Sequence, residues 1–362
     1  MRAYDVLIIG SGAAAYAAAI YARRYNLSVG IVAKMFGGYT ATAGVIENYP
    51  GTPKIDGYEL MEKMKAQAVD ELGTEIIEGE ATIVKNEYHC FQVQSSEGRV
   101  QSSEHGTLLL QAKTLILATG MEHRSLNLPR ENEYKAKGVH YCATCDGPVY
   151  RGKPVAVVGG GDSAVKSANQ LADMGAAHVS LIVREDNVDR AEPINRDRLM
   201  ERVSAGKMDV FYGTEVREYV GGPPLEAVRL ERRGGVTSPP IGRSDGHRTT
   251  PTGDSDLDVL PVNAVFIEVG ATPRNALAKE LGVILNPRGE VHVDPITMAT
   301  NVDGVFACGD LTDASGSFKQ IVTGAAQGAI AATSAYKDIS QHGRACEMHA
   351  VAISPPMLPA KT

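Results

Sequence analysis

The feature that most constrains this chain is a strand–glycine turn–helix pattern that occurs twice, about 150 residues apart. The first copy reads YDVLIIG, then GSGAAA, then the alanine-rich AAAIYARRY. The second reads KPVAVV, then GGGDSAV and a further helical stretch, before the strand-like AHVSLIV. Because buried strands are rich in aliphatic and β-branched residues and alanine is the best helix former, both copies predict a strand, a tight turn and a helix.

Each copy has small residues at the positions that a dinucleotide pyrophosphate requires. The first glycine makes the turn, the second lets the backbone approach the pyrophosphate, and a small third residue lets the helix pack close to the strand. These residues are Gly10, Gly12 and Ala15 in the first copy and Gly159, Gly161 and Ala164 in the second, with Ser11, Ala13, Asp162 and Ser163 as candidate neighbours. One copy alone would also fit a glycine turn without a ligand. The pair predicts an α/β protein with two Rossmann-like, doubly wound nucleotide-binding domains.

Composition sets the broad class. A chain of 362 residues is long enough for two or three domains, and 43% hydrophobic with 22% charged residues is typical of a soluble globular protein. The formal charge of −7 argues against nucleic acid as the main partner. No uninterrupted apolar run is long enough to span a bilayer, and five cysteines are too few for a disulfide framework. We therefore expect a cytoplasmic protein with no membrane segment.

Two further apolar segments end in small or acidic residues, which is where open α/β sheets bind ligands. The segment AKTLILATG ends in Ala118, Thr119 and Gly120, and TNVDGVFACGDLTD contains Gly309 and Asp310. The Asp310 carboxylate can accept hydrogen bonds from the hydroxyl groups of a sugar or ribityl chain. Either segment alone would also fit an ordinary exit from a strand.

The segment HYCATCDG places two residues between Cys142 and Cys145, with Asp146 directly after the second cysteine. A structural zinc site usually needs four Cys or His ligands, and His140 is the one further ligand nearby, so we predict no metal. The C-x-x-C spacing allows a small disulfide ring and can lower the pKa of one thiol. A carboxyl beside it can exchange the proton that such chemistry needs. The spacing favours a redox-active disulfide.

These motifs together resemble a known family. GSGAAAY, GGYTATAGVIENYPG, ILATG, GVHYCATCDG, VVGGGDSAV and GVFACGDLTD, in that order, are similar to the motifs of low-molecular-weight, bacterial-type thioredoxin reductases, from about residue 4 to 337. The resemblance implies an FAD-binding domain built from 1–118 and 259–337. It implies a second domain, 119–258, that binds NADH or NADPH, carries the redox cysteines and is inserted between those halves. The inserted domain would rotate, so that the disulfide and the nicotinamide take turns at the flavin.

The resemblance also implies roles for single residues. It places Gly37, Gly38, Tyr39, Asn48, Lys319 and Gln320 at the flavin, with Tyr39 and Lys319 standing where the family more often has glutamine and arginine. It makes Cys145 the flavin-facing charge-transfer thiol and Cys142 the interchange thiol that meets the partner. It implies a homodimeric, FAD-dependent disulfide oxidoreductase that reduces thioredoxin or a thioredoxin-like protein.

One departure from the family concerns the electron donor. NADPH-using relatives follow the second glycine turn's next strand with H-R-R and a further arginine, which bind the 2′-phosphate. Here HVSLIV runs into Arg184 and Glu185, with Arg190 further on. A carboxylate at this position usually binds the ribose hydroxyls of NAD and repels a 2′-phosphate, so the sequence slightly favours NADH over NADPH.

Two other functions stay open at this point. One is a flavin-dependent dithiol oxidase, which does not need the second glycine turn. The other is a thioredoxin reductase fed by ferredoxin or reduced deazaflavin, in which that turn would be vestigial. Two segments also stand apart: residues 232–258 are crowded with Gly, Pro, Ser, Thr and charge and predict a long mobile loop, and residues 338–362 predict a disordered tail.

Overall fold

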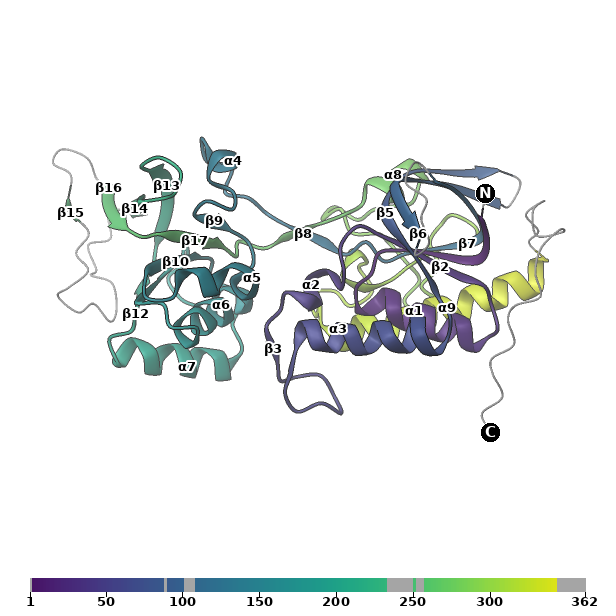
Figure 1. Cartoon of the computed structure of the whole chain (residues 1–362), viewed down its shortest axis with the longest axis horizontal. Helices are drawn as coiled ribbons and strands as arrows, with labels where there is room; N and C mark the ends of the chain where they lie inside the picture. The colour runs from purple at the N-terminus through teal and green to yellow at the C-terminus, as the bar shows by residue number, and fades with distance from the viewer. Residues whose placement is uncertain (1, 88–89, 101–107, 233–249, 252–256, 344–362) are drawn as a thin grey trace. The chain divides into compact units, whose positions relative to one another are not determined.

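The computed structural model of this chain describes residues 2–87, 90–100, 108–232, 250–251 and 257–343 (Figure 1). The chain forms two compact units. The first is made of the residues up to Glu122 together with those from Pro273 onward, and the second runs from His123 to Thr272. The second unit is therefore inserted into the first, as the family resemblance implied.

The first unit is built on a six-stranded sheet. Its strands are β1 (Arg2–Ile9), β2 (Val29–Ala33), β5 (Glu75–Glu87), β6 (Cys90–Val100), β7 (Leu108–Leu117) and β19 (Val305–Ala307). β1 pairs in parallel with β2 and β7, and β7 pairs in parallel with β19, whereas β6 is antiparallel to β5 and β7. Ile9 lies opposite Leu117, which in turn lies opposite Ala307. The register therefore brings the carboxyl ends of β1, β7 and β19 together.

Helices cover this sheet, and two of them pack closely (Figure 1). The helices are α1 (Ala13–Arg24), α2 (Gly38–Ala41), α3 (Gly57–Ala66) with the π-helical turn Gln67–Glu71, α8 (Ala276–Glu280) and α9 (Ile321–His342), and the short strands β3 (Val45–Ile46) and β4 (Ile55–Asp56) pair antiparallel. α1 lies against α9, and a Cβ at Gly328 would lie 2.1 Å from the Ala14 carbonyl oxygen. Alanines along α1 and a glycine in α9 thus allow the two backbones to approach.

The second unit contains a five-stranded parallel sheet and a smaller antiparallel one. The parallel sheet has the order β12 (Met208–Phe211), β11 (His178–Ile182), β10 (Pro154–Val158), β17 (Ala264–Ile267) and β9 (Val139–His140). The antiparallel sheet has the order β13 (Thr214–Val220), β14 (Ala227–Arg232), β16 (Leu257–Pro261) and β15 (Thr250–Pro251). The helices are α4 (Glu131–Tyr134), α5 (Ala143–Asp146), α6 (Asp162–Asp173) and α7 (Pro193–Ser204), with a 3-10 turn, η2 (Gly147–Tyr150).

Alternation along β10 gives this unit two hydrophobic cores. Val155 and Val157 pack with the buried residues of α6, while Ala156 and Val158 pack with those of the antiparallel sheet. Successive side chains of a strand point to opposite faces, so a strand buried on both sides needs apolar residues throughout. This explains the continuous apolar run in the sequence. The register again places strand ends together, because Val158 lies opposite both Ile182 and Ile267.

The predicted boundary at 259 is wrong. β16 pairs with β14, and β17 pairs with β10 and β9, so this stretch belongs to the second unit. The chain returns to the first unit at Pro273, where β18 (Ala271–Pro273) pairs with β8 (Met121–His123). Strand pairing between distant segments set this boundary, and composition does not change there.

Helix and strand residues occur within both of the segments set apart by composition. Within 232–258, Arg232 ends β14, Thr250–Pro251 form β15, and Leu257 begins β16. α9 continues to His342, so the chain is helical beyond residue 337. The remainder of both segments lies outside the described residues. Over the part of the chain that the structure describes, no helix is both long and apolar enough to cross a bilayer.

Candidate functional site

The first glycine of each turn is required by a neighbouring strand end. Gly10 has a φ of +123° and Gly159 a φ of +147°, which side-chain-bearing residues rarely adopt. A Cβ on Gly10 would lie 2.1 Å from the Ala118 carbonyl oxygen, and one on Gly159 would lie 2.3 Å from the Glu268 carbonyl oxygen. The two turns are therefore built alike, each with the carbonyl of an adjacent parallel strand against its glycine.

The second glycine of each turn faces open space. Gly12 and Gly161 are the N-caps of α1 and α6, and neither helix start has a side-chain cap. A Cβ on either glycine would meet no atom of the described residues within 4 Å. Packing within the protein therefore does not require glycine at these two positions. An anion that binds the uncapped helix amides would require it, because a side chain would fill the space in front of them. The third residues, Ala15 and Ala164, are fully buried, as the small-residue prediction requires.

Two more predicted residues lie against the first turn. A Cβ on Gly38 would lie 3.6 Å from the Gly12 Cα atom, so the Gly37–Gly38 turn approaches the space in front of α1. The Ser11 hydroxyl donates to the Met35 carbonyl oxygen, and Ala13 is buried at the start of the helix. Ser11 therefore joins this turn to the end of the loop after β2.

Asp310 presents a carboxyl at the end of β19. Burial raises its pKa, against the opposing charge of Lys319, and none of the described residues donates a hydrogen bond to it. The Lys319 ammonium group donates to the Asp310 carbonyl oxygen at 2.9 Å and also to that of Thr312. It pairs as well with the buried Glu290 carboxylate at 3.1 Å. Lys319, predicted to line the flavin, thus holds the turn that carries Asp310.

Sequence reasoning missed Gln327 of α9. This buried side chain accepts a hydrogen bond from the Gly309 amide at 2.8 Å and donates to the Ser315 hydroxyl at 2.5 Å. The signal was available, because Gln327 is a lone amide in the small-residue run GAAQGAI. At the start of the same helix, the Asn48 side chain donates to Gln320 at 3.2 Å, so the structure brings these two predicted residues together.

The remaining predicted residues of the first unit have structural partners. The Thr119 hydroxyl donates to the Arg274 carbonyl oxygen at 2.7 Å, and the Arg274 amide donates to Gly120 at 3.0 Å. These bonds join the two segments that run between the units. The Tyr39 carbonyl oxygen accepts a hydrogen bond from the Thr42 hydroxyl at 3.1 Å within the turn around α2.

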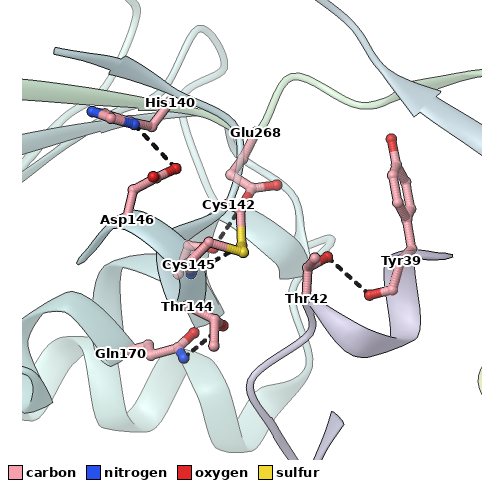
Figure 2. The surroundings of a disulfide bond; sticks show 10 residues. Tyr39, Thr42, His140, Cys142, Thr144, Cys145, Asp146, Gln170 and Glu268 are labelled. Carbon is pink, nitrogen blue, oxygen red and sulfur yellow. Dashed lines mark hydrogen bonds and ion pairs between the residues drawn. A yellow bond between two sulfur atoms is a disulfide. The ribbon is translucent and has the colours of Figure 1, made fainter. Parts of the chain in front are cut away.

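Cys142 and Cys145 form a disulfide whose Cα atoms are 5.4 Å apart. Cys142 precedes α5, and the Cys145 amide donates to the Cys142 Sγ atom at 3.0 Å (Figure 2). Between them, the Thr144 hydroxyl accepts a hydrogen bond from the Gln170 side chain of α6 at 2.9 Å. The helix that begins at the second glycine turn therefore also holds the cysteine loop in place.

Asp146 is paired with His140, the residue weighed above as a zinc ligand. The Asp146 Oδ2 atom lies 3.0 Å from His140 Nδ1, and His140 Nε2 lies 2.8 Å from the Tyr150 hydroxyl. Both ring nitrogens are engaged in this way. Among the described residues, no group of three or more His, Cys, Asp or Glu side chains is arranged to hold a metal ion.

Sequence reasoning also missed Glu268, which follows β17 and is among the residues around the disulfide in Figure 2. The Ser167 hydroxyl of α6 donates to its carboxyl at 2.8 Å. Burial raises the pKa of Glu268 to about 7. A lone acid at the end of the apolar run AVFIEVG is the same strand-end signal that singled out Asp310, so the sequence contained it.

Glu185 lies at the second glycine turn. Its Oε2 atom is 3.2 Å from the position of a Cβ on Gly160. Its Oε1 atom accepts a hydrogen bond from Arg184 at 3.1 Å and forms an ion pair with Arg190 at 3.3 Å. Burial alone would raise the pKa of Glu185, but the hydrogen bond from Arg184 and the charges of both arginines lower it overall. An ionised carboxylate therefore stands beside the turn, with two arginines paired to the same oxygen atom.

The first two residues of α6 differ in their surroundings, since one binds other parts of the protein and the other is exposed to solvent. The Asp162 carboxyl accepts hydrogen bonds from the Glu192 amide at 2.8 Å and the Asn195 side chain at 2.9 Å, which fixes the start of α7. Ser163 is exposed beside it. Asp162 is thus engaged within the protein, while the Ser163 hydroxyl is accessible to a ligand.

Comparison with known proteins agrees with this geometry. The pattern of the family described as pyridine nucleotide-disulphide oxidoreductase matches residues 4–328. The chain is 38% identical over 349 residues to a thioredoxin reductase of Eremothecium gossypii, covering 93% of this chain and 98% of that protein. It is 34% identical over 340 residues to an alkyl hydroperoxide reductase component of Escherichia coli, covering 92% of this chain but spanning 58% of that relative. The crystal structure of Lactococcus lactis thioredoxin reductase is 31% identical, with a TM-score of 0.78 over 93% of this chain and 99% of that one. The predicted resemblance and fold class are confirmed.

Glu268 makes the stability of the second unit depend on pH. A carboxyl whose pKa is raised from 4.5 to about 7 on folding stabilises the folded state fully below pH 4.5, and this contribution is lost as the pH rises through 7. Glutamine keeps the acceptor for Ser167 but does not ionise. Between pH 5 and pH 8, we expect the unfolding free energy of Glu268→Gln to fall by about 2–3 kcal/mol less than that of the wild type, measured by urea denaturation. The exposed Glu201→Gln is the control, and equal pH dependence in all three proteins would contradict the assignment.

Proposed function

The chain belongs to the pyridine nucleotide-disulphide oxidoreductase family, and we propose that it passes electrons from a reduced nicotinamide nucleotide, through FAD and the Cys142–Cys145 disulfide, to a thioredoxin-type protein. Membership of the family confirms the predicted class of enzyme, a disulfide oxidoreductase. The observation that carries the proposal is the link through α6. That helix starts at the second glycine turn and holds the disulfide loop through Gln170.

The first unit suits FAD, which supplies two-electron chemistry between a nicotinamide and a disulfide. The uncapped amides at Gly12 would receive the pyrophosphate, and the adjacent Gly37–Gly38 turn leaves room for the backbone to approach it. Asp310 needs donors that the described residues do not supply, and ribityl hydroxyl groups are such donors. In the same way, the uncapped amides at Gly161 would receive the nicotinamide nucleotide in the second unit.

The cysteine pair can perform the exchange that this function requires. Opening the disulfide takes two electrons and two protons and yields two thiols. The Cys145 amide, which points at the Cys142 Sγ atom, would stabilise a thiolate there. We assign Cys142 as the interchange thiol that attacks the partner disulfide and Cys145 as the flavin-facing thiol that then displaces the reduced partner. Asp146 exchanges the proton.

The partner and the assembly are inferred from the relatives. The similar proteins named thioredoxin reductases support thioredoxin or a thioredoxin-like protein as the acceptor, and we propose a cytoplasmic homodimer on the same resemblance. Experiment can separate this proposed function from the two alternative functions. A dithiol oxidase would consume oxygen with a dithiol, and a reductase fed by ferredoxin or deazaflavin would contain a flavin that neither nucleotide bleaches anaerobically.

Glu185 supports NADH as a donor at least as good as NADPH. Its ionised carboxylate stands beside the turn, and it could accept hydrogen bonds from the adenosine ribose hydroxyl groups of a nucleotide bound there. A 2′-phosphate about 5 Å from it would cost roughly 3 kcal/mol at an effective dielectric constant of about 20. Arg184 and Arg190 offset part of this repulsion.

The two glycine turns give a matched pair of variants. Valine at Gly12 or Gly161 would place its side chain where no described protein atom lies and where a pyrophosphate would lie. We expect Gly12→Val to purify without FAD, and Gly161→Val to stay yellow but lose anaerobic bleaching by either nucleotide. Flavin absorbance per chain and stopped-flow bleaching measure the two effects. Full FAD content in Gly12→Val would overturn the assignment of the first turn.

The cysteine pair is tested by single substitution. Cys142→Ser and Cys145→Ser should each lower reduction of a thioredoxin-type substrate by at least about 10²-fold while the nucleotide still bleaches the flavin. A long-wavelength thiolate absorption band should be retained in Cys142→Ser and absent in Cys145→Ser. The buried, free Cys308 supplies the control, Cys308→Ala, which should keep turnover. Normal turnover in both single variants would exclude the disulfide from the reaction.

Donor preference is tested by reversing one charge. Glu185→Arg should shift the ratio of flavin bleaching rates toward NADPH, by up to about a hundredfold on the electrostatic figure above. Asp186→Arg makes the same change of charge one residue away, where the carboxylate lies near Gly213, and should leave the ratio nearly unchanged. A clear NADPH preference in the wild type would contradict the role given to Glu185, without affecting the proposed reaction.

A further inference from the structure

A chain of three hydrogen-bonding side chains leads from the cysteine loop toward the interior of the second unit. It consists of Asp146, His140 and Tyr150, and Figure 2 shows its first link. The Asp146 carboxyl is 3.0 Å from His140 Nδ1, and Nε2 of the same ring is 2.8 Å from the Tyr150 hydroxyl. The Asp146 side chain is 40% exposed, whereas that of His140 is 6% exposed. The outer end of this chain can therefore exchange protons with its surroundings, while the imidazole is sheltered.

The two ends of the imidazole are coupled by its protonation. With a neutral ring, a proton on Nδ1 is donated to the Asp146 carboxylate, and Nε2 then accepts the proton of the Tyr150 hydroxyl. When the ring gains a second proton, Nε2 donates to the Tyr150 oxygen and the imidazolium neutralises the carboxylate. Burial and the nearby Asp146 charge raise the pKa of Tyr150, so its hydroxyl stays protonated in both states. The chain can thus store one proton without moving its heavy atoms.

The surroundings hold the ring and add few charges. The Phe266 ring of β17 stacks on His140 with centroids 5.3 Å apart, and the Tyr150 ring of η2 meets it edge-on at 5.2 Å. The Asp146 carboxylate of α5 faces the His140 ring, and the Lys153 ammonium group is 5.5 Å from the Tyr150 ring. Packing on both sides therefore fixes the imidazole toward Asp146.

We propose that His140 is a positioning residue of the redox centre: it orients Asp146, next to Cys145 on α5, and with Tyr150 stores the proton that Asp146 exchanges. The inference rests on the proposed function. Opening the disulfide breaks the S–S bond and consumes two electrons and two protons. The reduced nucleotide supplies both electrons and one proton, and solvent supplies the other through the exposed Asp146, with the buried His140 holding that proton between uptake and transfer. When the partner disulfide is reduced, the S–S bond forms again and both protons leave with the partner thiols.

The proposal predicts a direction for each variant. Without an imidazole, no cation balances the Asp146 carboxylate, so its negative charge disfavours the neighbouring thiolate and slows reaction of the reduced pair. We expect His140→Asn to lower the alkylation rate of the dithiol at pH 7 by about threefold or more and to lower turnover by about tenfold. Asparagine still donates to Asp146 but does not titrate. Tyr150→Phe should shift the pH profiles of alkylation and of turnover in the same direction as His140→Asn. Because it removes only a hydroxyl group, it is the variant less prone to a folding defect.

Asp146→Asn distinguishes a positioning residue from an independent one. If His140 acts through Asp146, adding His140→Asn to Asp146→Asn should change neither the alkylation rate nor the pH profile further. Equal effects of His140→Asn in both backgrounds, or unchanged pH profiles in His140→Asn and Tyr150→Phe, would overturn the proposal. Alkylation of the holoenzyme by iodoacetamide after reduction with dithiothreitol needs neither nucleotide nor protein partner. It therefore tests this proposal even if the proposed electron donor or acceptor is wrong.

Discussion

The contact on which both candidate sites depend is that of a strand-end carbonyl against a glycine. Ala118 faces Gly10 in this way, and Glu268 faces Gly159. Because strand register brings these ends together, the turn after the first strand has no room for a side chain, and the chain must enter the helix through a positive φ. That path leaves the first helix amides uncapped and facing open space. The open space before each helix is thus a consequence of how closely the parallel strands approach.

In the second unit, the helix that follows this turn does more than present amides. α6 uses one face to hold the surroundings of the disulfide. Ser167 donates a hydrogen bond to Glu268, and Gln170, three residues after Ser167, donates one to Thr144. Side chains three apart lie on the same face of a helix, so one rigid element fixes both a carboxyl and the cysteine loop. A change that displaces α6 would therefore alter the nucleotide turn and the disulfide together.

Sequence alone predicted what is encoded locally. Gly10, Gly12 and their counterparts follow from a short pattern, and the cysteine pair follows from its spacing. Sequence reasoning missed Glu268 and Gln327, because their importance depends on which strand and turn lie beside them. The boundary set at 259 failed for the same reason, since β17 joins the second unit by pairing with β10 and β9. The unusual Lys319 has a partner, Glu290, that no local pattern indicates.

The two units share a further feature beside their glycine turns. Each carries a carboxyl at a strand end, Asp310 after β19 and Glu268 after β17, and burial raises the pKa of both. In the first unit, the charge of Lys319 opposes that rise. In the second, a neutral serine hydroxyl is the partner, and the pKa of Glu268 reaches about 7. The same strand-end position therefore carries two different carboxyls, because one has a cation nearby and the other has a neutral hydroxyl.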